Sequence, residues 1–166
     1  FAAEKFIAIS DWRVNIDPIL ERLGATIHAS HAYLFEQHLS SSGERVSSLR
    51  YEWTAPGQIS DLGEGAFQSN HLVEDGFENY FDTLRKENSF VGSKSTFLPR
   101  EKKYFDALGI KAILEVPLFI HGQWWGTIGF DDHENEREWS TAEVDALKIA
   151  AGILSAAIQR QEADSA

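Results

Sequence analysis

The sequence of 166 residues contains no cysteine. A chain without cysteine forms no disulfide and offers no thiolate, which excludes thiol nucleophiles, thiolate metal sites and thioether-linked chromophores. Methionine is absent too and the chain begins at Phe1, from which we expect a fragment of a longer protein. No apolar run approaches the ~20 residues that cross a bilayer, and no signal peptide is visible, so we expect a soluble, cytoplasmic domain.

Positive charge is also scarce. The chain has 15 lysines and arginines against 26 aspartates and glutamates, which gives a net charge of −11. Phosphate backbones and anionic lipid surfaces bind cationic faces, so this charge argues against nucleic-acid binding and against membrane contact. A hydrophobic content of 43% and an aromatic content of 12% are typical of globular proteins, and we expect one domain over residues 1–166.

The clearest local pattern is a hairpin between residues 115 and 130. Apolar residues alternate with other side chains at its start, which is the period of a strand whose two faces meet different surroundings. His121-Gly122 predicts the turn, because both residues tolerate a positive φ. In the returning strand, alternation places Trp124 on one face and Trp125 on the other.

A long helix is predicted over residues 140–161. Ser140 and Glu143 have the spacing of a capping box, in which each side chain satisfies a free backbone N–H group of the first turn. Apolar residues then repeat at spacings of three and four, as in a short coiled-coil seam. We predict a dimer interface formed by Val144, Leu147, Ala151, Leu154 and Ile158.

The N-terminal third predicts helices followed by a strand pair. Helical spacing covers residues 1–23, and Gly24 is expected to end the second helix. Strands over residues 27–37 and 46–54 are expected to pair in an antiparallel hairpin. Alternation in the second strand places Leu49, Tyr51 and Trp53 on one side.

The middle of the chain is less regular. Residues 55–76 have no clear period, and a loop of this length in a compact domain is typically functional or mobile. Beyond it, the spacing predicts a short helix over residues 77–87, a short strand over 90–97 and a second short helix over 99–108.

Three runs of residues carry a family resemblance. Residues 109–118 (GIKAILEVPL), residues 122–132 (GQWWGTIGFDD) and residues 138–140 (EWS) with the alanine-rich helix resemble the C-terminal half of a GAF domain. Residues 20–24 and 32–36 resemble the first helix and strand of that fold. The resemblance implies an α/β (α+β) architecture: a central antiparallel sheet of about five to six strands, terminal helices on one face, and short helices and loops on the other.

The resemblance also implies a function. It is closest to the subgroup found in bacterial and archaeal sensor histidine kinases and related signalling proteins. It therefore implies a non-catalytic sensory module of a two-component system that binds a small molecule and relays the signal through terminal helices as a homodimer. A ligand-free structural dimerisation domain is the alternative. Because cysteine is absent, the methionine sulfoxide reductase activity and covalent bilin attachment of some GAF domains are not expected.

Aromatic residues are the candidates for a ligand pocket. Apolar walls with a few polar groups define small-molecule sites, although the same residues can equally fill a second core between the sheet and its covering helices. The identity of any ligand or cofactor is open. The predicted pocket residues are Tyr51, Trp53, Tyr80, Phe90, Phe97, Tyr104 and Trp125, with Phe77 as a further candidate.

Metal and catalytic sites are not expected. Residues 131–136 form the most metal-like cluster, but adjacent side chains point in different directions, so we expect a solvated loop. His28 and His31 would fall on opposite faces of a strand, and His71 is the first candidate for a haem ligand. No catalytic motif is present, which leaves a non-thiol enzyme using His71 or His133 as the least favoured alternative.

Overall fold

A six-stranded antiparallel sheet forms the centre of the fold, with the strand order β3-β2-β1-β6-β5-β4. The computed structural model describes residues 11–63, 67–68, 70–71 and 77–165, so the helix expected over residues 1–10 lies outside the described residues. The predicted sheet of five to six strands is confirmed. Its strands are β1 (His31–Leu39), β2 (Arg45–Thr54), β3 (Asn70–His71), β4 (Phe90–Ser93), β5 (Ala112–Ile120) and β6 (Gln123–Asp132).

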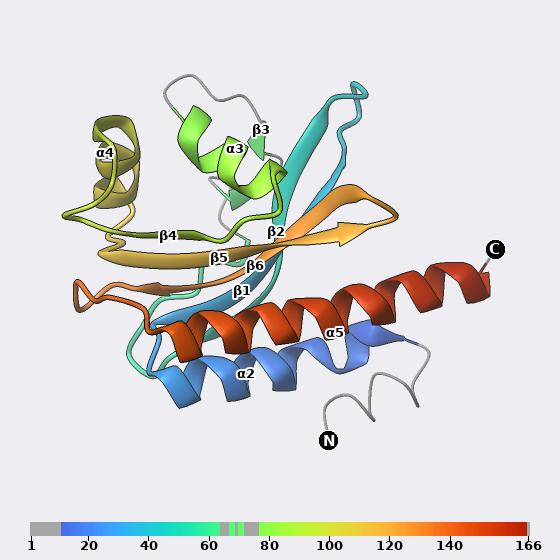
Figure 1. Cartoon of the computed structure of the whole chain (residues 1–166), viewed down its shortest axis with the longest axis horizontal. Coiled ribbons are helices and arrows are strands. Elements are labelled where there is room, and N and C mark those ends of the chain that lie inside the picture. The colour runs from blue at the N-terminus through green and yellow to red at the C-terminus, as the bar shows by residue number, and fades with distance from the viewer. Residues whose placement is uncertain (1–10, 64–66, 69, 72–76, 166) are drawn as a thin grey trace.

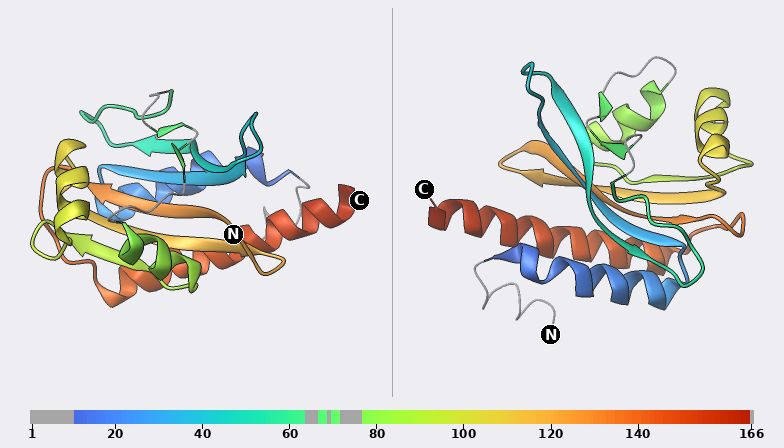
Figure 2. Two further views of the ribbon diagram at one scale, coloured as in Figure 1. Left: turned by 90° about the horizontal axis from the view of Figure 1, so that it is seen from above. Right: turned by 180° about the vertical axis from the view of Figure 1, so that it is seen from behind.

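Helices cover both faces of the sheet. Figures 1 and 2 show α2 and α5 side by side on one face, and α3 and α4 on the opposite face, as the predicted architecture requires. No helix of the described residues combines the length and apolarity needed to cross a membrane. The helices are the 3-10 helix η1 (Trp12–Val14), α2 (Ile16–Ile27), α3 (Glu78–Arg85), α4 (Pro99–Ala107) and α5 (Thr141–Ser165).

The main core lies between the sheet and the pair α2 and α5. It includes Leu147, Ala151, Leu154 and Ile158 of α5, which are buried against the sheet, with the half-buried Val144 packed beside them. These five residues are the predicted dimer seam, and the structure places them inside the single chain instead. The reason is that spacings of three and four serve a helix on a sheet as well as a helix on a helix.

The termini of the long helices follow local rules, with one exception. Ser140 Oγ accepts from Glu143 N at 3.1 Å and Glu143 Oε1 accepts from Ser140 N at 2.9 Å, so the predicted capping box is confirmed. However, α2 continues past Gly24 to Ile27 and ends where His28 adopts a left-handed φ of 58°. His28 therefore ends a helix, and the first strand begins at His31 rather than at residue 27.

A β-bulge in β2 changes which side chains share a face. Leu34 of β1 pairs with Tyr51, but Phe35 pairs with Leu49, so Arg50 is an extra residue without its own partner in β1. One inserted residue reverses the alternation beyond it. Leu49 consequently lies on the α3 side, whereas Tyr51 and Trp53 pack with the core beneath α2.

A second bulge has the same effect in β6. Leu118 of β5 pairs with Gly126, and Phe119 pairs with Trp124, so Trp125 is the extra residue. Trp124 therefore lies on the α3 side, and Trp125 joins the core on the α5 side. The turn between these strands is as expected, because both His121 and Gly122 have positive φ, 51° and 76°.

The two helical glycines provide a matched test of the packing of α2. A Cβ atom at Gly24 would lie 2.3 Å from the Trp53 ring, whereas one at Gly152 on α5 would meet nothing within 4 Å. Gly24→Ala should therefore destabilise the protein by about 1–3 kcal/mol through overpacking. Gly152→Ala should stabilise it by about 0.5–1 kcal/mol, because alanine favours the helix. Urea unfolding measures both, and equal stability of Gly24→Ala and wild type would contradict the close packing of α2 on Trp53.

Candidate functional site

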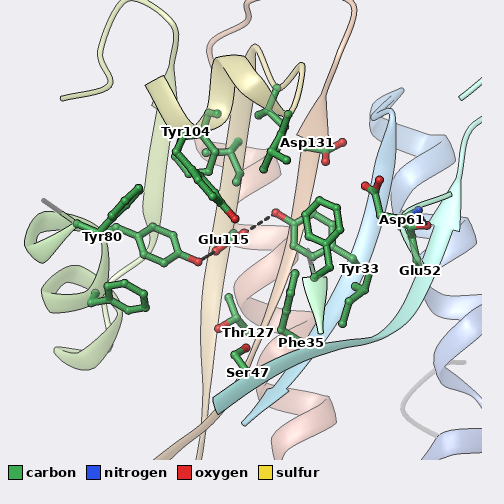
Figure 3. Close-up of a pocket in the computed structure, with 18 of the residues that line it drawn as sticks. Tyr33, Phe35, Ser47, Glu52, Asp61, Tyr80, Tyr104, Glu115, Thr127 and Asp131 are labelled. Atoms are coloured by element: carbon green, nitrogen blue, oxygen red, sulfur yellow. Dashed lines mark hydrogen bonds between the residues drawn. The ribbon is translucent and has the colours of Figure 1, made fainter. Parts of the chain in front are cut away.

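A cavity of about 300 Å³ lies between the sheet and the helices α3 and α4. This volume is at the lower end of the range of about 300–1,000 Å³ for small-molecule sites. Figure 3 shows side chains from both the strands and the covering segments converging on it. Its aromatic lining consists of Tyr33, Phe35, Phe67, Phe77, Tyr80, Phe81, Tyr104, Phe105 and Trp124.

The structure brings only some of the predicted pocket residues together. Tyr80 and Tyr104 line the cavity, and so does Phe77. Phe90 and Phe97 do not line it; they lie behind Phe105 in a buried cluster, where they fill core space. The second-core alternative therefore holds for these two phenylalanines.

The other three predicted residues are on the wrong face. Tyr51, Trp53 and Trp125 pack on the α2 and α5 side because the bulges in β2 and β6 reverse the alternation. Trp12 of η1 contacts two of them edge-on, with ring centroids 5.7 Å from Tyr51 and 5.7 Å from Trp125. These residues pack against the main core on that face and do not line the cavity.

Sequence reasoning missed the polar part of the lining. Four carboxyl side chains, Glu52, Asp61, Glu115 and Asp131, line the cavity. Glu115 had a visible signal, because it is the one ionisable residue in the apolar run AILEVPLFI of β5. A carboxyl group in a buried strand requires hydrogen-bond partners, which in turn marks a specialised site.

Two tyrosines supply those partners to Glu115. Tyr33 Oη donates to Glu115 Oε2 at 2.5 Å, and Tyr80 Oη donates to Glu115 Oε1. Glu115 is 3% exposed, and burial raises the pKa of its carboxyl group. Burial and the neighbouring Glu115 also raise the pKa of both phenols well above the usual value. The bridge joins β1, β5 and α3 through one carboxyl group.

His31 forms the second polar feature of the site. Its Nδ1 lies 2.7 Å from Asp131 Oδ1, and its Nε2 lies 2.8 Å from the Ile59 carbonyl oxygen. The carbonyl only accepts, so Nε2 carries a proton, and the carboxylate favours a second proton on Nδ1. Burial opposes the charge, but the hydrogen bond to Asp131 and the negative charges nearby outweigh it and raise the pKa of His31 to about 9.

Two more carboxyl groups lie near His31: Glu52 of β2 and Asp61 of the loop that follows β2. Glu52 Oε1 accepts from Ser60 Oγ at 2.8 Å and from Asp61 N at 2.9 Å, which holds the loop against the strand. Asp61 Oδ2 then lies 4.0 Å from His31 Nε2. Burial and the charge of Glu52 raise the pKa of the Asp61 carboxyl group. Sequence alone could not place this loop beside β1, because the contact is between separate segments.

The same groups have the composition of a metal site. Ligand atoms of His31, Asp131 and His133, and likewise of His31, Glu52 and Asp61, lie within 4.8 Å of one another. However, both ring nitrogens of His31 face oxygen acceptors, so the geometry favours a charged ring over a metal ligand.

The acidic segment 131–136 does not act as one cluster. Asp132 Oδ1 accepts from the backbone N–H groups of Glu134 and Asn135 and shapes the turn. Glu136 reaches away to Ser95 N at 2.8 Å. The side chain of His71, the haem candidate, lies outside the described residues, so that hypothesis stays untested.

Sequence comparisons relate the chain to signalling proteins. A family model described as GAF domain matches residues 11–158. The methanogenesis regulatory histidine kinase FilI of Methanothrix harundinacea is 34% identical over 142 residues, which cover 86% of this chain and 16% of that kinase. An uncharacterized protein of Azorhizobium caulinodans is 24% identical over 147 residues, which cover 86% of this chain and 20% of that protein. The chain thus spans a fifth or less of the length of these relatives.

Solved structures share the fold. The phycoerythrobilin-bound GAF domain from a cyanobacterial phytochrome matches with a TM-score of 0.76 at 14% identity, covering 99% of this chain and 96% of that one. A GAF domain of Synechocystis in its photoproduct state matches with a TM-score of 0.69 at 17% identity, covering 91% and 96% of the two chains. At these identities the likeness establishes the architecture.

The charge on His31 predicts a pH-dependent stability. Its pKa rises from 6.5 to about 9 on folding, so its stabilising contribution is complete below pH 6.5 and is lost as the pH rises through 9. The loss is at most on the order of 3 kcal/mol, at about 1.4 kcal/mol per pKa unit. Thermal unfolding between pH 6 and 10 should show this decline in wild type and a flatter profile in His31→Gln.

His38→Gln is the control for this measurement. His38 lies on the same strand and contacts Ser48 instead of the acidic groups, so this variant should keep the wild-type decline. A wild-type protein whose stability does not change over this pH range would show that His31 is neutral when folded.

Proposed function

Because the chain belongs to the GAF domain family, we propose that it is the non-catalytic sensory module of a cytoplasmic sensor histidine kinase in a two-component system. A small molecule binds in the cavity, and the terminal helices carry the bound state to the rest of the protein. The aromatic-lined cavity of about 300 Å³ on the face opposite α2 and α5 is the observation that carries this proposal. The sequence similarity to a regulatory histidine kinase supports the proposal that the module controls a kinase.

A chain of polar contacts supports a route from the cavity to the helices. Asp131 lines the cavity, and its carbonyl oxygen accepts from Ser30 N at 2.8 Å in the segment after α2. The next residue, Asp132, lies 3.8 Å from Arg137 Nη1. Arg137 in turn donates to the Ile27 carbonyl oxygen at 2.8 Å and to Glu143 at 2.6 Å. One guanidinium group thus joins the end of α2 to the start of α5.

Output through helices requires a second copy of the chain, for which α5 offers a surface away from its own core. Ile149 is 64% exposed at the middle of that surface. Exposed small residues flank it at spacings of three and four, and they allow two helices to approach closely. We place the homodimer contact on this outer stripe of α5, which consists of Ala142, Ala146, Ile149, Gly152 and Ala156.

Replacing Ile149 by Glu should break the dimer without unfolding the protein, because the side chain is outside the core. Light scattering should show a dimer mass for wild type and a monomer mass for Ile149→Glu. Leu39→Glu is the matched control, since Leu39 is 66% exposed at the end of β1 and away from the stripe. A dimer mass for Ile149→Glu, or a monomer mass for wild type, would contradict this interface.

Ligand binding is tested by filling the cavity. Ser47 on β2 lines it, and Ser47→Trp should occupy the space with an indole ring. A native mass spectrum of the untreated protein should show an added small-molecule mass, or a metabolite library should raise the thermal midpoint. At 100 times Kd the stabilisation is about 2.7 kcal/mol. Both effects should be lost in Ser47→Trp.

The alternative function, a structural dimerisation domain without a ligand, predicts a different result. A ligand-free dimerisation domain would show neither the added mass nor any thermal shift in wild type, yet would still give the dimer mass in light scattering. That combination would replace the sensory proposal.

A further inference from the structure

The charge of the cavity lining has one sign. Glu52, Asp61, Glu115 and Asp131 line it, and no lysine, arginine or histidine is among the lining residues that the structure describes. The buried His31 is behind this wall, bonded to Asp131 at 2.7 Å, and offsets one of the negative charges. Burial keeps such charges poorly screened, so the cavity disfavours an anion.

The acidic and aromatic linings occupy different ends. Figure 3 shows Glu52, Asp61 and Asp131 gathered at one end of the cavity and Tyr80 and Tyr104 at the other. Glu115 lies between the two ends, held by its tyrosines. A guest that fits both ends has a positively charged head and an apolar body.

The pKa shifts of two groups that line the cavity agree with a negative potential in this space. The pKa of the Asp61 carboxyl group is raised by burial and then by the charge of Glu52. The pKa of the Tyr104 phenol is raised by burial and then by Glu115. Two groups at opposite ends of the cavity thus both resist gaining negative charge.

We propose that this cavity selects an organic cation, in which an amine or ammonium group is carried on an aromatic or aliphatic body. The inference rests on the proposed sensory function and adds the chemical class of its ligand. The ammonium group contacts the carboxylates of Glu52, Asp61 and Asp131. The body packs on the rings of Tyr80 and Tyr104 at the other end. A bare metal ion would leave the aromatic end unfilled.

Three probes with one aromatic body test the charge preference: 2-phenylethylamine, 2-phenylethanol and 3-phenylpropanoate. Their affinities for the wild-type protein are measured by calorimetry at pH 7 and physiological salt. The amine should bind about tenfold more tightly than the alcohol, because its ammonium group pairs with the carboxylates at the acidic end. The carboxylate should bind more weakly than the alcohol, because like charges meet at the acidic end.

Substitutions that remove one negative charge test which residues produce the preference for the amine. Asp61→Asn and Glu52→Gln should each bring the affinity for the amine close to that for the alcohol, while the affinity for the alcohol changes by less than about twofold. Asp82→Asn is the control, because Asp82 is an exposed carboxylate of α3 that pairs with Arg85 outside the lining. That variant should keep the wild-type order of the three affinities. Ser47→Trp should prevent binding of all three.

The outcomes separate the two proposals. If the alcohol or the carboxylate binds as tightly as the amine, the cation inference fails and ligand binding in the cavity stands. If zinc ions displace the amine at a concentration below the Kd of the amine, the acidic end is a metal site and the inference fails. If none of the probes binds at millimolar concentration, the cation inference fails, whereas the sensory proposal fails only if the native mass spectrum and the metabolite library also show no ligand.

Discussion

The hydrogen bond between His31 and Asp131 is the contact on which the site depends. It joins the two central strands, β1 and β6, at 2.7 Å in a buried position. A protonated ring there compensates the Asp131 charge and leaves Nε2 to hold the Ile59 carbonyl oxygen. That second bond brings the loop with Asp61 over the cavity. Removing either partner would leave a buried charge without compensation, which costs more than the pair contributes.

The sheet separates two kinds of interior. On one face, apolar side chains of the sheet pack against α2 and α5 and form the main core. On the other face, α3, α4 and the described residues Asp61 and Phe67 border a cavity lined by phenols and carboxyl groups. Buried polar groups cost free energy unless they are satisfied, so their concentration on one face indicates a role other than stability. Arg137 joins the end of α2 to the start of α5 on the first of these two faces.

Much of the fold could be predicted from local sequence signals. The His121-Gly122 turn, the capping box of Ser140 and the antiparallel hairpin of β1 and β2 depend on residues close in the chain, and each was confirmed. The faces of β2 and β6 could not be predicted, because a single extra residue, Arg50 or Trp125, reverses the alternation without changing composition. Tyr80 and Tyr104 could be predicted in the site because aromatic residues commonly line ligand pockets. Glu52 and Asp61 could not, because their place at the cavity depends on a long-range contact of the loop after β2.

The Glu115 bridge has a thermodynamic consequence for access to the cavity. Tyr33 and Glu115 belong to the sheet, but Tyr80 belongs to α3, so the Tyr80 phenol ties the covering helix to the sheet. A guest that binds an oxygen of Glu115 competes with the hydrogen bond from Tyr80. The two interactions are then reciprocal: a guest bound to Glu115 weakens the hydrogen bond from Tyr80, and loss of that hydrogen bond strengthens the binding of the guest to the same degree.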